Sequence, residues 1–333
     1  MTINALPLPT PADRAEWLEQ RRHGLGSSDA ATVVGLNPYE SPYSLWEQKT
    51  GKAPLELPVD DDQAERMEWG NLLEPVVRDE TARRLGLTIA KPDHGHHHRD
   101  HEWLRCNLDG WTEDGRLAEF KTTHPRNADQ WDSHIPDLAE VQVHHAANVV
   151  GATHAVVACL IGGQRLVIHE VALNRNVQDM LLEAEADFWE HVQRDTPPPL
   201  DGHTSTLDAL TREWAHKPEP REVVAEEVVE PWQQYLHAVA DEKDAVARKK
   251  EAQARLAALM DGHGKLVTGD RVWAAAQRGQ LAERRLQAEH PELYAKYLAP
   301  REAFDRDAFK ADHPDVFQQF QGVSIRARGA LGD

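Results

Sequence analysis

A period-two alternation of apolar and polar residues marks the middle of the chain and predicts a β-hairpin over 103–123. Leu104, Cys106 and Leu108 alternate along a first strand, Asp114-Gly115 marks the turn, and 117–122 forms the return strand. A second hairpin is predicted from the strand-like segments at 155–161 and 166–171, which flank two glycines. Both hairpins are expected to contribute to one central sheet.

Helical patterns follow these strands. Apolar spacing predicts a helix over 176–192, and a long helix over 231–260 is rich in strong helix formers. A small hairpin is expected over 265–277. Two similar pieces, AEHPELYAKY at 288–297 and ADHPDVFQQF at 311–320, each place a proline at the beginning of a short helix.

Proline-rich and polar residues divide these elements into two parts. We expect a domain over 1–200, a linker over 201–221 and a mainly helical C-terminal accessory region with a small β-hairpin over 222–333.

Candidate chemistry lies on the first hairpin, where Asp109 precedes Glu119 and Lys121 by about ten residues. Residues two apart in a strand share a face, so Glu119 and Lys121 point the same way and Phe120 points into the core. A two-residue loop would pair Asp109 with Phe120. A three-residue loop with Gly115 in the left-handed conformation would pair Asp109 with Glu119, and we predict this second register.

Two carboxylates at this spacing suit a hard divalent cation. Mg²⁺ is usually held by one or two carboxylates together with water and phosphate oxygens, and Asp109 with Glu119 supplies that number. Lys121 would orient or help deprotonate the attacking water and stabilise charge on a phosphate. The alternative is a solvated hairpin face that carries ordinary exposed charges.

Four segments carry a wider resemblance. They are WLEQRRHGLGSSDAATVVGLNPYESPYSLWEQKTG at 17–51, MEWGNLLEP at 67–75, LDG with LAEFKTT within 108–123, and QVHHAANVVG at 142–151. In this order they closely resemble the YqaJ-type viral recombinase family, which is grouped with the lambda-type exonucleases among the PD-(D/E)XK nucleases. The resemblance spans roughly 14–200 and implies an α/β (α+β) nuclease core, in which helices flank a mixed central β-sheet.

The resemblance also implies roles for individual residues. Asp109 and Glu119 match metal ligands, Lys121 matches the catalytic lysine, and Glu74 matches the helical acid that completes the metal site. Gln142 falls where the family places an active-site glutamine, on a helix expected to pack against the hairpin. For Glu74 the alternative is an exposed helix carboxylate, and for Gln142 it is a buried amide with its hydrogen bonds satisfied.

Near the start of the chain, Arg21 and Ser28 match residues that hold a terminal 5′-phosphate in lambda-type exonucleases. An arginine fork with hydroxyl and backbone donors suits a phosphate dianion. Ser27-Ser28-Asp29 before an apolar run also predicts a helix N-terminus, so plain capping is the alternative. Asn107 is expected to add a further donor.

The sequence departs from the family pattern at three places. Asn107-Leu108 precedes Asp109 where the family name calls for proline, His144 replaces a second glutamine, and Ala139 replaces a tyrosine. Because of these changes, the sequence does not determine how the attacking water is activated or how DNA is bound. The histidine-rich stretch at 94–101 is expected to be a polar surface loop rather than a zinc site.

The composition of the chain limits the classes of protein to which it can belong. The 333 residues are 40% hydrophobic, contain no apolar run long enough to span a bilayer, and begin without a secretory signal pattern. Cys106 and Cys159 are too few for a disulfide framework or a four-cysteine iron–sulfur cluster, so we expect a cytoplasmic protein. The resemblance implies a bacterial host cell and a phage or prophage origin.

A net charge of −19 is unusual for a protein that binds DNA. Screening over about 8 Å allows a local cationic groove beside acidic surfaces. The expected groove cations are Arg21, Arg22, Lys49, Lys52, Lys121, Arg126 and Arg165.

These observations lead to an expected function: a Mg²⁺-dependent deoxyribonuclease, with Mn²⁺ as the alternative metal, that digests double-stranded DNA ends. The resemblance implies 5′-to-3′ polarity, production of single strands for phage-type recombination, a single-strand annealing protein as partner, and a homo-oligomer, a trimer in the lambda-type branch. The alternatives are an endonuclease or nickase of the same fold, and a catalytically silent DNA-binding scaffold. Two interpretations of the accessory region also stay open: it is either a packing or oligomerisation module, or an arm that guides DNA or docks a recombination partner.

Overall fold

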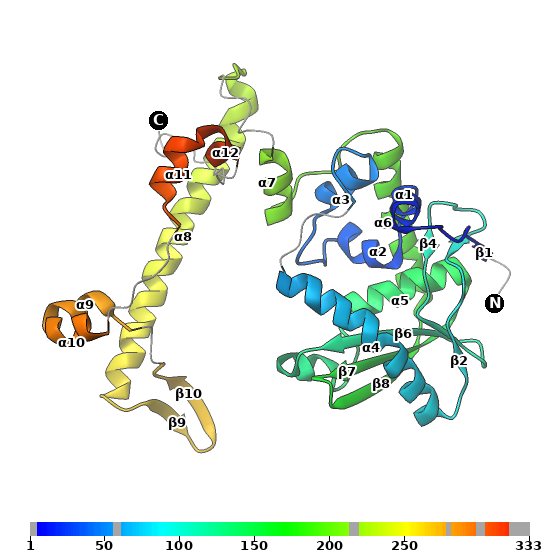
Figure 1. Cartoon of the computed structure of the whole chain (residues 1–333), viewed down its shortest axis with the longest axis horizontal. Coiled ribbons are helices and arrows are strands. Elements are labelled where there is room, and N and C mark those ends of the chain that lie inside the picture. The colour runs from blue at the N-terminus through cyan, green and yellow to red at the C-terminus, as the bar shows by residue number, and fades with distance from the viewer. Residues whose placement is uncertain (1–4, 56–60, 213–219, 278–280, 298–303, 320–333) are drawn as a thin grey trace. The chain divides into compact units, whose positions relative to one another are not determined.

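The structure is a computed structural model that describes residues 5–55, 61–212, 220–277, 281–297 and 304–319. Their contacts divide the chain into two units, with the division after Arg212. The first unit contains the central sheet and its helices, and the second contains one long helix, a hairpin and short helices (Figure 1).

A five-stranded mixed sheet forms the centre of the first unit. Its order is β2-β5-β6-β7-β8, and its strands are β2 (Ile89–Ala90), β5 (Gly110–Thr112), β6 (Leu117–Thr123), β7 (His154–Ile161) and β8 (Arg165–Ala172). Only the β6–β7 pair is parallel. Parallel strands require a crossover, which the 3₁₀ helix η1 (Pro125–Trp131) and α5 (Asp137–Val150) supply.

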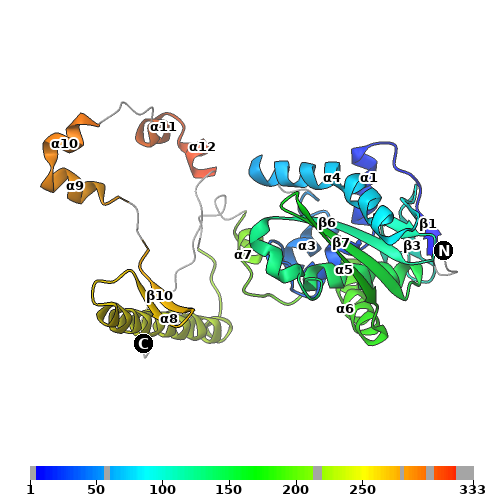
Figure 2. The ribbon, with the colours of Figure 1, turned by 90° about the horizontal axis from the view of Figure 1, so that it is seen from below.

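Helices cover both faces of this sheet, as the side view shows (Figure 2). Leu117 of β6 joins the core on the α5 side, and its neighbour Ala118 joins the core on the side of α4 (Asp61–Leu85). Phe120 also packs on the α4 side. Glu119 and Lys121 therefore share the α5 face with Leu117, as the period of the strand requires.

A third cluster of apolar side chains joins the helices that precede and follow the sheet. The helices around it are α1 (Arg14–Arg22), α2 (Ser27–Val33), α3 (Pro42–Lys49) and α6 (Arg175–Gln193). Leu25, Leu45 and Trp46 pack there against Phe188 and Trp189 of α6. This packing fixes the N-terminal helices beside the sheet.

The predicted first strand of the 103–123 hairpin is divided between two sheets. Arg105–Cys106 is β4, which belongs to a separate antiparallel sheet: β4 pairs with β3 (His96–His98), and β3 pairs on its other side with β1 (Ala5–Pro7). The chain leaves that sheet at Asn107 and enters the main sheet at Gly110. The expectation of a histidine-rich surface loop was wrong for His96–His98, because they form β3 and His96 is buried.

The expected linker over 201–221 needs a correction at its beginning. Thr204–Thr211 forms α7, which packs on α3, and the Ser41 backbone N–H donates to Ser205 Oγ at 2.8 Å. These residues therefore belong to the first unit. Residues 213–219 of the linker lie outside the described residues.

The second unit follows the predicted elements closely. The long helix is α8 (Ala225–Met260), and the hairpin is β9 (Lys265–Thr268) with β10 (Arg271–Ala275). The short helices are α9 (Glu283–Glu289), α10 (Pro291–Lys296), α11 (Arg306–Asp312) and α12 (Pro314–Gln319). Pro291 and Pro314 each begin a helix, so that prediction is confirmed. Among the described residues, no helix combines the length and apolar character needed to cross a membrane.

Replacement of Leu117 by alanine tests the core. Leu117 is fully buried between β6 and α5, so Leu117→Ala is expected to lower the free energy of unfolding by about 2–5 kcal/mol, measured by chemical denaturation. Met180→Ala on α6 is the control, because Met180 is 70% exposed and its loss should change stability by less than about 0.5 kcal/mol. Equal effects of both changes would contradict this description of the core.

Candidate functional site

The turn of the β5–β6 hairpin places Asp109 opposite Glu119. Gly110 pairs with Ala118, Trp111 pairs with Leu117, and the Thr112 N–H donates to the Arg116 carbonyl at 2.9 Å. The loop is therefore the three residues 113–115, and Gly115 has a φ of 90°. Both features confirm the predicted register. One further step along the ladder brings Asp109 level with Glu119.

Side-chain contacts draw this group together. The Asp109 carboxylate Oδ2 accepts a hydrogen bond from the Phe120 backbone N–H at 3.0 Å. Lys121 Nζ donates to Glu119 Oε1 at 2.5 Å. The structure thus brings Asp109, Glu119 and Lys121 to one end of the hairpin, as the sequence predicts.

This group contains two carboxylates but only one amine. Burial and the neighbouring Glu119 carboxylate raise the pKa of Asp109 to about 7. Burial alone would lower the pKa of Lys121, but the Glu119 and Asp109 carboxylates outweigh it and raise that pKa above its usual value. Lys121 is therefore a cation at neutral pH, and a second cation beside Asp109 would favour its ionised form.

Gln142 lies on α5, which packs against β6, so the predicted helix position is confirmed. Its Oε1 is buried and has no hydrogen-bond partner among the described residues. A buried, satisfied amide was the alternative for Gln142, and the unpartnered oxygen argues against it. Such an atom is costly unless a ligand or water pairs with it.

Glu74 is held apart from the other two acids. Its Oε1 accepts a hydrogen bond from Lys91 Nζ at 2.6 Å and lies 3.8 Å from Arg78 Nη1. Its charge still contributes to the raised pKa of Asp109. Within the described ranges, no three Asp, Glu, His or Cys side chains stand close enough to hold a metal ion. The three-carboxylate arrangement expected from the sequence is therefore not assembled.

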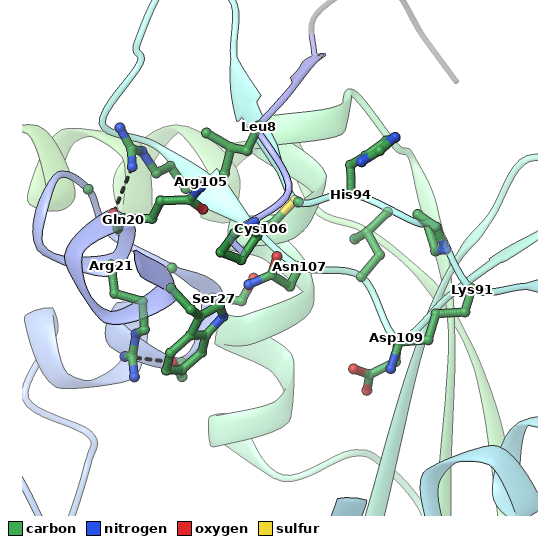
Figure 3. A pocket seen from close by; sticks show the side chains of 18 of the residues that line it. Leu8, Gln20, Arg21, Ser27, Lys91, His94, Arg105, Cys106, Asn107 and Asp109 are labelled. Carbon is green, nitrogen blue, oxygen red and sulfur yellow. Dashed lines mark hydrogen bonds between the residues drawn. The ribbon is translucent and has the colours of Figure 1, made fainter. Parts of the chain in front are cut away.

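A cavity of about 500 Å³ joins the carboxylates to the N-terminal helices. Asp109, Glu119, Lys121 and Gln142 line it together with the sequence-predicted phosphate ligands Arg21, Ser28 and Asn107. In Figure 3, Arg21 and Ser27 lie on one wall, Asp109 lies on the opposite side, and Asn107 lies between them. Except for Glu74, the predicted site residues therefore line one cavity.

The guanidinium of Arg21 is held in place by an ion pair with the buried Asp29, which also pairs with Lys49. Arg21 Nη2 contacts Asp29 Oδ1 at 2.7 Å and Ser28 Oγ at 3.4 Å. Lys49 Nζ donates to Asp29 Oδ2 at 2.7 Å and to the Arg21 carbonyl at 2.8 Å. The pKa of Asp29 lies well below its usual range, because Lys49 and Arg21 outweigh the opposing effect of burial. Lys49 was expected in an open groove, which was wrong, since its side chain is 1% exposed.

The helix N-terminus predicted at Ser27-Ser28-Asp29 is confirmed. α2 begins at Ser27, and Asp29 Oδ2 accepts a hydrogen bond from the Gly26 N–H at 3.0 Å. Capping thus uses Asp29 and leaves the two serine hydroxyls for other contacts. Ser27 Oγ is buried without a partner among the described residues, and Ser27 lines the cavity.

Sequence reasoning missed several residues of this cavity. Ser27, Trp17, Lys91 and His94 line it, and His94 Nδ1 lies 2.8 Å from Thr10 Oγ1. Ser27 and Trp17 stood inside a segment that the sequence did single out. His94 belongs to the histidine-rich stretch that was interpreted as a surface loop, and nothing local marked Lys91. Both reach the site through tertiary contacts, because Thr10 lies beside His94 and Glu74 of α4 pairs with Lys91.

His144 and His145, also on α5, have structural contacts. His144 Nε2 accepts from the Asn174 N–H at 3.1 Å. His145 is fully buried, with Nδ1 2.6 Å from Glu185 Oε1 and Nε2 2.7 Å from the Arg105 carbonyl. His145 therefore ties α5 to the β4 strand that leads to Asp109.

The donor set of the cavity fits a hard divalent cation. Asp109 and Glu119 supply carboxylate oxygens, and the unpartnered Gln142 oxygen lies in the same cavity. Burial and the adjacent Glu119 carboxylate raise the pKa of Asp109, and a bound cation would lower it. A divalent cation that binds oxygen ligands would neutralise the two carboxylates and could pair with the Gln142 oxygen.

Comparison with known proteins relates this region to one family. Residues 16–153 match the YqaJ-like viral recombinase domain. The curated protein YqaJ of Bacillus subtilis strain 168 is 29% identical over 291 residues, which cover 85% of this chain and 90% of that protein.

Solved structures of low sequence identity are also similar. The alkaline exonuclease LHK-Exo from Laribacter hongkongensis superimposes with a TM-score of 0.46 at 13% identity, covering 54% of this chain and 93% of that one. A phage-related exonuclease from Haemophilus somnus 129PT gives a TM-score of 0.40 at 11% identity, covering 51% and 94%.

The raised pKa of Asp109 predicts a pH-dependent cost to stability in metal-free protein. An acid whose pKa is higher in the folded state loses stabilisation as pH rises from the unfolded value, about 4, to the folded value, about 7. Asp109→Asn should therefore gain stability relative to wild type over this range, by at most roughly 1.4 kcal/mol per pH unit.

Denaturant unfolding in chelator at several pH values measures this difference. Asp79→Asn, at an exposed position of α4, is the matched control and should leave the pH profile unchanged. A constant difference between Asp109→Asn and wild type from pH 4 to 7 would contradict the raised pKa.

Proposed function

We propose, from the premise that residues 16–153 form a YqaJ-like viral recombinase domain, that this chain is a metal-dependent deoxyribonuclease acting on the ends of double-stranded DNA. One observation carries the proposal: the hairpin register sets Asp109 level with Glu119, beside Lys121, in a cavity that also contains Arg21 and Ser28. Carboxylates for a cation and cationic donors for a phosphate thus share one cavity. A phosphodiester hydrolase needs both.

We assign metal binding to Asp109 and Glu119, with Mg²⁺ as the ion that their oxygen ligands suit and Mn²⁺ as the alternative. When bound, the ion would supply Lewis-acid stabilisation and lower the pKa of water. Glu74 would join as a third ligand only by exchanging its contact with Lys91, which is 2.6 Å away. Gln142 would orient water or phosphate through its unpartnered oxygen.

Lys121 acts in this proposal as a fixed cation. Its raised pKa keeps the amine protonated, so it donates hydrogen bonds to a phosphate oxygen and stabilises the negative charge that develops during hydrolysis. Help in deprotonating the attacking water was the other role expected for Lys121, but a protonated amine cannot accept that proton. Its contact with Glu119 holds it on the cavity face of β6.

Arg21, Ser28 and Asn107 would bind the terminal 5′-phosphate. The Arg21 guanidinium lies at the cavity wall and is held in place by Asp29, which suits a rigid, doubly hydrogen-bonded grip on a dianion. A phosphate site on the wall facing the carboxylates favours attack near a 5′ end. This geometry supports 5′-to-3′ digestion and the release of single strands for phage-type recombination with an annealing protein.

Substitution of Lys121 tests catalysis. With Mg²⁺ and linear duplex bearing 5′-phosphates, Lys121→Ala should lower kcat about a hundredfold or more, because it removes the cation that stabilises developing charge. The release of acid-soluble nucleotides measures the rate. Lys265→Ala, which removes an exposed lysine of β9, is the control and should retain wild-type activity.

Three other outcomes of that assay would each overturn part of the proposal. Equal digestion by wild type and Lys121→Ala would remove the catalytic assignment. Cleavage of closed circular duplex would identify an endonuclease or nickase instead. Binding of duplex without Mg²⁺-stimulated hydrolysis by the wild type would identify a catalytically silent scaffold.

Substitution of Arg21 tests the end specificity separately. Arg21→Ala should raise KM for 5′-phosphorylated duplex about tenfold or more and leave KM for 5′-hydroxyl duplex nearly unchanged, since charged hydrogen bonds to the terminal phosphate are lost. Arg83→Ala, at an exposed position of α4, provides the matched control. An equal loss on both substrates would assign Arg21 to folding or general DNA binding.

A further inference from the structure

Within the second unit, the long helix α8 carries apolar side chains that the other described residues of that unit do not bury. It spans Ala225–Met260, 36 residues, which corresponds to roughly 54 Å at 1.5 Å per residue. None of its residues is buried. Val239 and Val246 are 46% and 45% exposed, and Leu256 is 40% exposed. An isolated helix of this kind gains most of its stability from packing of its apolar stripe.

The apolar residues of α8 follow a seven-residue repeat. One series comprises Val228, Tyr235, Glu242, Lys249 and Leu256, and it is apolar except for its two central members. The second series, four residues further on, comprises Trp232, Val239, Val246, Gln253 and Met260, and Gln253 is its one polar member. Alternating steps of three and four residues produce a single seam along the helix, the pattern of a helix that pairs with another helix.

Charge is segregated along the same helix. The first half, 225–242, contains five acidic residues and no lysine or arginine, whereas the second half, 243–260, contains five basic and two acidic residues. The acidic half would repel a DNA backbone, which disfavours α8 as an arm that guides DNA. The two halves are complementary to each other.

This segregation selects both the partner and its orientation. If two copies of α8 ran parallel and in register, Glu242 would face Glu242 and Lys249 would face Lys249 within the seam. In an antiparallel pair with Glu242 of each copy opposite Lys249 of the other, residues 231–242 of each copy lie along 249–260 of the other, and Tyr235 lies opposite Leu256 of the second copy. The two charges that interrupt the seam then compensate each other.

We propose that α8 is a dimerisation element that pairs antiparallel with α8 of a second copy of this chain. The contact is two-fold symmetric, so each copy contributes the same surface. The opposite charges of Glu242 and Lys249 set the orientation, and the apolar seam supplies the affinity. This inference uses only the second unit and does not depend on the nuclease proposal.

Sedimentation equilibrium of the full chain tests the pairing. The wild type should be a dimer at micromolar concentration, and Glu242→Lys or Lys249→Glu alone should weaken dimerisation about tenfold or more, since each places like charges in the seam. The double change E242K with K249E should restore the wild-type dissociation constant within a few-fold. Arg271→Glu on β10 is a charge-reversal control outside the helix and should not change it.

Cysteine pairs test the orientation, because the native Cys106 and Cys159 are both buried. Tyr235→Cys and Leu256→Cys chains should form an intermolecular disulfide when mixed, and neither should do so alone. A parallel pair would give the opposite result. A monomeric wild type, a trimer insensitive to Glu242→Lys, or cross-linking of each cysteine variant with itself would overturn the proposal.

Discussion

The register of the β5–β6 hairpin is the constraint on which the site depends. A three-residue loop that ends in a glycine with positive φ sets Asp109 level with Glu119, and a shift by one residue would turn one of the two carboxylates to the opposite face. The same register creates an electrostatic cost, because two acids share a partly dry location with a single ammonium group. The fold therefore holds the carboxylates in a state that a cation would stabilise.

The opposite wall of the cavity is organised by a different means. Two cations, Arg21 and Lys49, share the buried carboxylate of Asp29, and removing one member of such a cluster leaves a charge uncompensated in a dry environment. This arrangement joins α1, α2 and α3 and holds one guanidinium at the cavity surface. One wall thus presents negative charge and the other presents positive charge, which is the polarity that a metal ion and a phosphate require.

Local patterns predicted much of this, and the misses have a common cause. The strands β6, β7 and β8, the helix α8 and the loop at Gly115 follow from periodicity and turn chemistry within short segments. The division of the first strand between two sheets did not, because it depends on β1 and β3, which come from distant parts of the chain. Lys49 was assigned to the surface for the same reason: its burial is decided by tertiary partners. The spacing of Asp109, Glu119 and Lys121 in the sequence was enough to predict that they lie together, whereas the salt bridge between Glu74 and Lys91 could not be predicted in this way.

The crossover between β6 and β7 has a consequence for how the molecule assembles. The carboxylate pair is contained within fifteen consecutive residues, 109–123, and such a short hairpin can close in microseconds. Arg21, on the opposite wall of the cavity, lies almost ninety residues earlier in the chain than Asp109. The helix α5, which carries Gln142, is fixed in place only when β7 pairs with β6. Both parts of the site therefore form through slow, long-range chain closure. During synthesis, Arg21 and its helix emerge first and the two acids emerge next, so the carboxylate pair stays uncovered on the α5 side until α5 and the last strands have been made.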